Sequence, residues 1–273
     1  MPLTLFLLVL AAAALHASWN AIVKRGPDKL LGTVLVTGSA ALLSAAVLPW
    51  LPLPAPDSRP WLAASILLQA LYYALVARCY HQVDMSLAYP LMRGCAPVVV
   101  ALIGSVLGEP LSTPAWIGIA LVSTGILCMA TGVRVAQLAL PLLTAAMIAT
   151  YTLVDAHGAR ISGHPLSYTL WLFLLSGLPL PVWALLRRRA ALAAYAHAHW
   201  KLGMVGGIGT TVSYAIALWA MTQAPIAMVA ALRETSILFA LLISAWVLGE
   251  RVPRFRWAAA SLIVAGAVAL RAG

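Results

Sequence analysis

The sequence predicts an all-α integral membrane protein with ten transmembrane helices, arranged as two inverted five-helix repeats. The prediction comes from the composition, from ten apolar runs of bilayer length and from an internal repeat. Hydrophobic residues make up 63% of the chain and charged residues only 9%, whereas about a quarter of a soluble domain is charged. A globule of 273 residues cannot bury this surplus, so most of the chain is expected to face lipid or to pack between lipid-facing helices.

Apolar runs of about 20 residues, the length that crosses a bilayer as a helix, recur ten times along the chain. They are too long and too uniformly apolar for barrel strands, which alternate in polarity over about ten residues. The connectors between them are short and carry proline, glycine or basic residues. The expected spans are residues 3–23, 30–50, 60–80, 85–107, 113–132, 136–157, 166–186, 201–221, 225–248 and 255–271.

The two halves of the chain align without a gap when one is shifted by 141 residues. The shift places Leu107-Gly108-Glu109 on Leu248-Gly249-Glu250, and in the same register it places His16 on His157, Trp116 on Trp257, and Gly125 on Gly266. Each half holds five spans, an odd number, so the second half must enter the membrane from the opposite side. The predicted repeats are residues 1–134 and 135–273.

The formal charge of +10 comes from basic residues in short loops between the apolar runs. This pattern indicates membrane topology and argues against a nucleic-acid partner. Twelve basic residues fall on one side of the predicted spans, which the positive-inside rule assigns to the cytoplasm, with both termini outside. They are Lys24, Arg25, Lys29, Arg78, Arg134, Arg187, Arg188, Arg189, Lys201, Arg251, Arg254 and Arg256, while Arg59, Arg160 and Arg271 lie on the other side.

Several motifs resemble the EamA branch of the drug/metabolite transporter superfamily. These are LHASWNAIVK in the first span, Leu-Gly-Glu after the fourth span of each half, and ALRETSILFALLISAWVLGER in the second half. The resemblance covers essentially the whole chain. It implies a ten-helix carrier for small metabolites, often an exporter of amino acids or similar solutes, that works by alternating access. It also implies cytoplasmic termini, opposite to the charge count, so both orientations stay open.

The strongest candidate site is in the fourth span of each half. A basic residue inside an apolar span is costly and normally marks a substrate path or an ion pair, and Arg93 is such a residue. The 141-residue shift places Arg93 on Glu234, so we expect the two to form a buried pair across the pseudo-two-fold axis. In the competing interpretation, Glu234 neutralises Arg233 and Arg93 meets the substrate. Tyr89 precedes Arg93 by one helical turn. Two nearby prolines are expected to loosen this helix, either as a hinge at a binding site or as a kink that only improves packing.

A polar stripe on the first span is the second candidate. His16, Asn20 and Lys24 recur every four residues, so they share one helical face. They line a cavity in one interpretation; in the other, His16 and Asn20 join helices by hydrogen bonds and Lys24 reaches the membrane surface. His157 repeats His16 in the second half, which favours the cavity. The full predicted substrate-binding set is His16, Trp19, Asn20, Tyr73, Tyr89, Arg93, His157, Tyr214, Arg233 and Glu234.

The predicted function is a secondary transporter for a small anionic or zwitterionic metabolite, such as an amino acid or a phosphonate-type solute. The resemblance adds export across a bacterial inner membrane. The seven acidic residues form no paired-carboxylate or metal-binding cluster in the sequence, so no enzyme, cofactor or metal is predicted. A lipid flippase or a membrane-embedded lipid-modifying enzyme is the alternative. Protons are a candidate coupling ion, and the internal symmetry requires no dimer.

Overall fold

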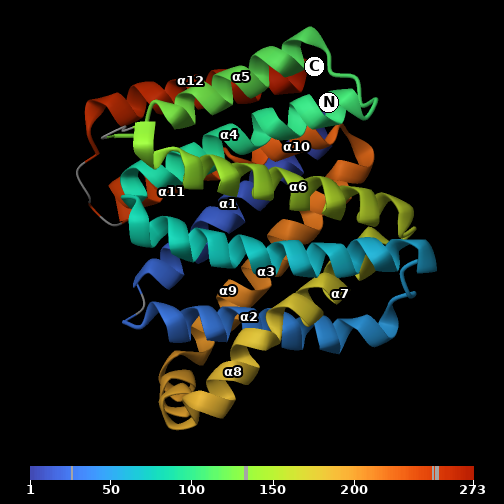
Figure 1. Ribbon diagram of the computed structural model, residues 1–273, viewed down its shortest axis with the longest axis vertical. Coiled ribbons are helices and arrows are strands. Elements are labelled where there is room, and N and C mark those ends of the chain that lie inside the picture. The colour runs from blue at the N-terminus through green and yellow to red at the C-terminus, as the bar shows by residue number, and fades with distance from the viewer. Residues whose placement is uncertain (26, 132–134, 248, 250–251) are drawn as a thin grey trace.

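The computed structural model describes residues 1–25, 27–131, 135–247, 249 and 252–273, with only the backbone described for residues 22–25 and 136 (Figure 1). These residues form helices, and no strand occurs among them. Within this part of the chain, nine helical segments are long and apolar enough to cross a membrane, and a tenth apolar helix is shorter. The predicted ten-helix membrane fold is confirmed.

The first half consists of five helices whose bounds lie close to the predicted spans. Three of them begin at a polar residue that caps the helix N-terminus, namely Asp28, Asp84 and Ser112. Two short 3₁₀ turns connect the second helix to the third. In order, the elements are α1 (Leu3–Arg25), α2 (Lys29–Val47), η1 (Leu48–Trp50), η2 (Pro56–Ser58), α3 (Arg59–Gln82), α4 (Met85–Val106) and α5 (Thr113–Leu127).

The second half is more broken than the sequence predicted. The span at 166–186 is divided before Pro179, since proline cannot donate to a helical hydrogen bond. The span at 201–221 belongs to a longer helix that kinks at His199, and the span at 225–248 is interrupted by a turn at Glu234. The elements are η3 (Val135–Gln137), α6 (Ala139–Ile161), α7 (Pro165–Gly177), α8 (Pro179–Arg187), α9 (Arg189–Gln223), α10 (Ile226–Arg233), α11 (Ser236–Leu242), the π-helical η4 (Ile243–Val247) and α12 (Arg254–Ala272).

The helix bounds follow the repeat closely. Adding 141 to the bounds of α4 gives 226–247, which is the span formed by α10, α11 and η4. The backbone N–H of Ile226 at the start of α10 donates to Oε2 of Glu109, which follows the end of α4, at 2.9 Å. The end of α4 therefore lies beside the start of its equivalent, so the two run in opposite directions. The predicted inverted repeat is confirmed.

Some sequence predictions fall outside the described residues. Leu248 and Glu250 of the second Leu-Gly-Glu motif lie outside the described residues. The predicted division after residue 134 adjoins 132–134, which are also outside. Of the basic residues in the charge count, Arg134 and Arg251 are not described, nor are the side chains of Lys24 and Arg25.

Equivalent helices also pack against each other at the edge of the bundle. α5 and α12 lie side by side (Figure 1) and approach closely because glycines face each other at their crossing. A Cβ added at Gly118 would lie 2.9 Å from the Gly266 carbonyl oxygen, and one at Gly266 would lie 2.8 Å from that of Gly118. Small residues permit such contacts between membrane helices. The termini meet at one end, where the amino group of Met1 donates to the carbonyl of Arg271 at 3.1 Å.

Candidate functional site

The two charged residues that occupy equivalent positions in the repeats form an ion pair. Nε of Arg93, on α4, lies 2.8 Å from Oε2 of Glu234, at the end of α10, and the two side chains are only 15% and 7% exposed. The predicted pairing is confirmed. Removing one partner of a buried pair leaves an uncompensated charge, which is why such pairs are strongly coupled.

Backbone hydrogen bonding is interrupted on both sides of this ion pair, because proline has no N–H to donate and because a turn follows α10. α4 contains Pro90 and Pro97, three residues before and four residues after Arg93. In the second repeat, the N–H of Glu234 donates to the Ala231 carbonyl at 3.1 Å, a tight turn that separates α10 from α11. Irregular backbone at membrane depth is tolerated where protein surrounds it or where it lines a cavity. The backbone hydrogen bonding of both central helices, α4 and α10–α11, is therefore interrupted close to the ion pair.

A second chain of polar contacts starts at Arg233. Its guanidinium carbon lies 5.0 Å from the centre of the Tyr214 ring, an arrangement that attracts the cation to the ring face. The Tyr214 hydroxyl donates to Oδ2 of Asp155, and Nε2 of Gln69 donates to the same oxygen at 3.3 Å. Asp155 is completely buried. The chain links α10 to α9, α6 and α3.

A small cavity adjoins the ion pair. Its volume of about 20 Å³ is room for roughly one water molecule. Residues of both repeats line it, and the charged ones are Arg93, Arg233 and Glu234. The remaining lining residues are Ala96, Pro97, Val100, Ile148, Tyr151, Thr152 and Ala230.

The site brings acidic and basic side chains together. The buried cluster combines two arginines, Arg93 and Arg233, with two carboxyl groups, those of Glu234 and Asp155. The cavity is therefore lined by an acidic group, Glu234, as well as by the basic groups of Arg93 and Arg233.

Aromatic side chains surround the charged groups. The ring of Tyr151 lies 5.3 Å from that of Tyr72, which lies 5.4 Å from Tyr73. On α1, which packs against α10, His16 and Trp19 meet edge to face at 5.4 Å. Two helices that the sequence marked as polar or aromatic, α1 and α3, thus approach the cluster.

Other predicted residues lie apart from the cavity lining. Tyr73 is 60% exposed, and Asn20 is exposed with its amide donating to the His16 carbonyl at 2.8 Å. His157 is exposed and packs against the Trp61 ring at 4.3 Å. Tyr89 is half-buried and packs against the main core one turn before Arg93. The side chain of Lys24 lies outside the described residues.

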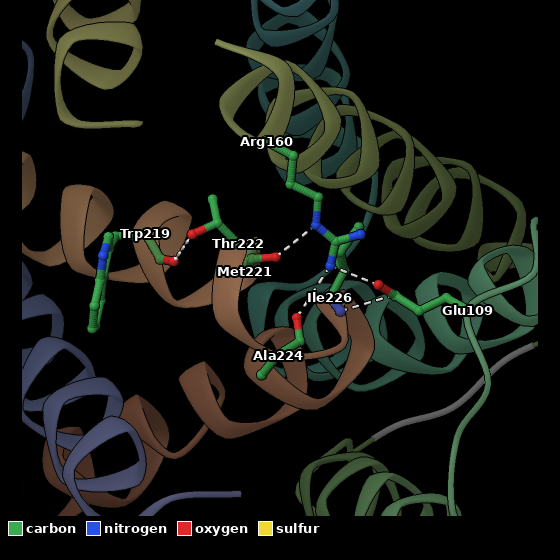
Figure 2. A network of polar contacts seen from close by, with 7 residues as sticks. All are labelled: Glu109, Arg160, Trp219, Met221, Thr222, Ala224 and Ile226. Carbon is green, nitrogen blue, oxygen red and sulfur yellow. Dashed lines mark hydrogen bonds and ion pairs between the residues drawn. The ribbon is translucent and has the colours of Figure 1, made fainter. Parts of the chain in front are cut away.

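A second ion pair closes the end of the bundle where the termini lie, and we call it the terminal clasp (Figure 2). Nη2 of Arg160, in the last turn of α6, lies 2.6 Å from Oε1 of Glu109 and donates to the Ala224 carbonyl at 3.1 Å. Its Nε donates to the Met221 carbonyl at 2.8 Å. The other oxygen of Glu109 accepts from the N–H of Ile226. The clasp thereby joins the α4–α5 connection, α6 and the α9–α10 connection.

Several of these residues were not among the functional candidates that the sequence indicated. Asp155, Gln69 and the cavity residues Tyr151 and Thr152 were not in the predicted set. A signal existed for Asp155, because an acidic residue inside an apolar run is itself a functional indicator. Asp155 and His157 are two residues apart, so they lie on different faces of the helix. The sequence does not show which of these two faces is buried.

An inverted repeat of broken helices around buried charges is the architecture of many secondary transporters. The model of the EamA-like transporter family matches residues 3–131 and 136–272. The chain belongs to this family, and it is therefore a multi-pass membrane protein of a family that transports small solutes.

Comparison with solved structures supports the fold. One crystal structure is 18% identical and superimposes with a TM-score of 0.72, covering 97% of this chain and 94% of the other. At this identity the match shows the fold alone. A comparison with curated protein sequences gives no match.

Proposed function

We propose that this protein is a secondary transporter that exports a small zwitterionic or anionic metabolite across a bacterial inner membrane by alternating access. An amino acid or a phosphonate-type solute has the required chemistry. Family membership supports the transport of a small solute. The observation that carries the proposal is the Arg93–Glu234 ion pair, which lines a cavity built by both repeats.

The balance of charges favours a zwitterion over a simple anion. A substrate that carries an acid group and an ammonium group can offer a partner to each member of the Arg93–Glu234 pair. A simple anion would take Arg93 and leave the Glu234 carboxylate without a partner, which is costly in a buried site. Arginine suits the acid group because its planar fork matches carboxylates and phosphonates. Arg233, in the same lining, adds a second cation.

Closure at one end supports alternating access. The cavity has room for about one water molecule, so a metabolite can enter only after the surrounding helices separate. At the end where the termini lie, separation requires Arg160 to leave Glu109 and two backbone carbonyls. The prolines of α4 and the turn at Glu234 provide points where the central helices can bend.

Ligand-induced stabilisation of the purified protein tests the proposal. A ligand that binds only the folded state raises the melting temperature by mass action. In a panel of amino acids, phosphonates, organic anions and quaternary amines, we expect a zwitterion to stabilise the protein. The effect should disappear in Arg93→Ala and persist in Arg78→Ala, which removes an exposed arginine from α3.

A cation-binding site would give the opposite result. A quaternary amine that stabilises Arg93→Ala but not Glu234→Gln would show a cation site and contradict the proposed substrate class. Export is then tested with the stabilising compound in radiolabelled form. Inverted membrane vesicles should accumulate it, and preferential accumulation by right-side-out vesicles would indicate import.

A further inference from the structure

Asp155 is a buried acidic residue that the Arg93–Glu234 pair does not explain. It lies six residues before the end of α6 and is completely buried by the protein itself. At 1.5 Å per residue this is about 9 Å from the helix end. Buried ionisable residues at such positions in membrane proteins are rare and mark ion or proton paths.

The partners of the Asp155 carboxyl group are neutral. Oδ2 accepts hydrogen bonds from the Tyr214 hydroxyl and the Gln69 amide. Oδ1 is buried and has no hydrogen-bond partner among the described residues. The Ser65 hydroxyl, which accepts from the Gln69 amide at 3.3 Å, faces the carboxyl group. These partners are all neutral side chains, so none of them supplies a positive charge that would compensate a buried carboxylate.

The charged and titratable groups around Asp155 come from several helices. α9 contributes Tyr214, and α7 contributes Tyr168, which packs against Gly158 on α6. α10 contributes Arg233, whose guanidinium group lies over the Tyr214 ring. α4 contributes Arg93, already paired with Glu234, and α3 faces the carboxyl with the uncharged Gln69 and Ser65. At the end of α6, η2 carries the exposed Asp57.

No cation lies within ion-pair distance of Asp155 in the described part of the chain, since Arg233 acts only across a ring. A buried carboxylate without a paired cation costs several kcal/mol, and such a group avoids the cost by taking up a proton. We propose that Asp155 is a proton-binding site of the transporter, occupied while the cavity is closed and emptied when the site opens to water.

This proton site rests on the proposed transport function and adds its coupling. On opening, the O–H bond of the Asp155 carboxylic acid breaks, its electron pair stays on the carboxylate and the proton passes to an entering water molecule. The new negative charge faces Arg233 across Tyr214 and offsets its positive charge. Proton occupancy at Asp155 thus sets the net charge of Asp155 and Arg233 together, which a substrate in the cavity would meet. A pH gradient can therefore drive the cycle.

Infrared difference spectroscopy tests the proton site without a substrate. The protein in phospholipid vesicles is compared at mildly acidic and alkaline pH. We expect the carbonyl-stretching band of a protonated carboxylic acid at mildly acidic pH and its loss at alkaline pH. The band should be absent from Asp155→Asn and present in Glu234→Gln, the matched control for a second buried carboxyl group.

A further variant covers the case in which Asp155→Asn does not fold. Tyr214→Phe removes the donor to Oδ2, so the same band should remain and move to higher frequency. Absence of the band from the wild-type protein at mildly acidic pH, or its persistence in Asp155→Asn, would overturn the proposal. So would an unshifted band in Tyr214→Phe. Any of these results leaves ligand-induced stabilisation as an independent test of the transport function.

Discussion

Among the described residues, two ion pairs cross between the repeats, and they are built differently. Arg93 and Glu234 meet through one contact between side chains that are 15% and 7% exposed, beside the cavity. In the terminal clasp the side chains are 34% and 18% exposed, and backbone groups of the α9–α10 connection complete the contacts. A buried pair depends on both charges, whereas water can replace the contacts of an exposed one. The central pair therefore suits binding, and the clasp suits reversible closure.

The largest expected effect is a change in the free energy of unfolding, and it distinguishes the Arg93–Glu234 pair from the terminal clasp. Arg93→Met leaves the Glu234 carboxylate buried without a partner, so the free energy of unfolding should fall by about 3–5 kcal/mol. The double variant Arg93→Met, Glu234→Gln should recover most of the loss, because it buries no lone charge. Denaturant or thermal unfolding in detergent measures both changes. Arg78→Met, at an exposed position, is the control. Additive losses in the double variant would show that the two residues are not coupled.

Breaking the clasp should cost less stability and change access instead. Arg160→Gln removes a partly exposed ion pair, which is worth about 1 kcal/mol or less, and about 1 kcal/mol corresponds to roughly a fivefold shift toward the open state. A cysteine at the cavity residue Ala230 reports the shift by its rate of reaction with a membrane-impermeant maleimide added at the terminal end. The native Cys79, Cys95 and Cys128 are first replaced by alanine.

Arg59→Gln is the matched control for this labelling. Arg59 is an exposed basic residue at the start of α3, which the charge count places at the same end as Arg160. Loss of the Arg59 charge should leave the rate of maleimide labelling unchanged. Equal rates in Arg160→Gln and in the parent protein would show that the clasp does not hold the cavity closed.

The smallest effect concerns an exposed carboxylate outside the ion pairs. Asp84 caps α4, and hydrogen bonds from the side chain and backbone of Ser86 lower the pKa of its carboxyl group below the ordinary value. Because the folded pKa is lowered, this stabilisation is complete above the unfolded pKa of about 3.9 and is lost as pH falls through the folded value.

Asp84→Asn keeps an equally good N-cap and removes the titration. The wild-type protein should therefore be slightly more stable than the variant near neutral pH, and the difference should vanish in strong acid. Melting temperatures across this pH range measure it. A difference that grows on acidification would contradict the assignment.

The sequence predicted the features that depend on pattern over long distances. Run length indicated the spans, and the 141-residue shift placed Arg93 opposite Glu234. Both succeed because lipid demands long apolar helices and because equivalent positions in an inverted repeat meet near its axis.

Features that depend on helix rotation and on local backbone could not be predicted. α6 is apolar on all sides apart from a few residues, so the sequence could not show that Asp155 faces the protein while His157 faces outward. The clasp uses the carbonyls of Met221 and Ala224, which are free only because α9 ends there. A backbone carbonyl that is free to accept a hydrogen bond cannot be recognised from the sequence. Arg160 could therefore be interpreted only as a marker of membrane topology.

One paired experiment tests the division of roles most directly. Ligand-induced stabilisation and maleimide labelling of Ala230→Cys are measured in the same protein carrying either Arg93→Met or Arg160→Gln. We predict that Arg93→Met abolishes stabilisation by the zwitterion, while Arg160→Gln preserves it and speeds labelling from the terminal end. If Arg160→Gln abolished ligand stabilisation and Arg93→Met left it intact, the binding site would lie at the clasp and the account would be wrong.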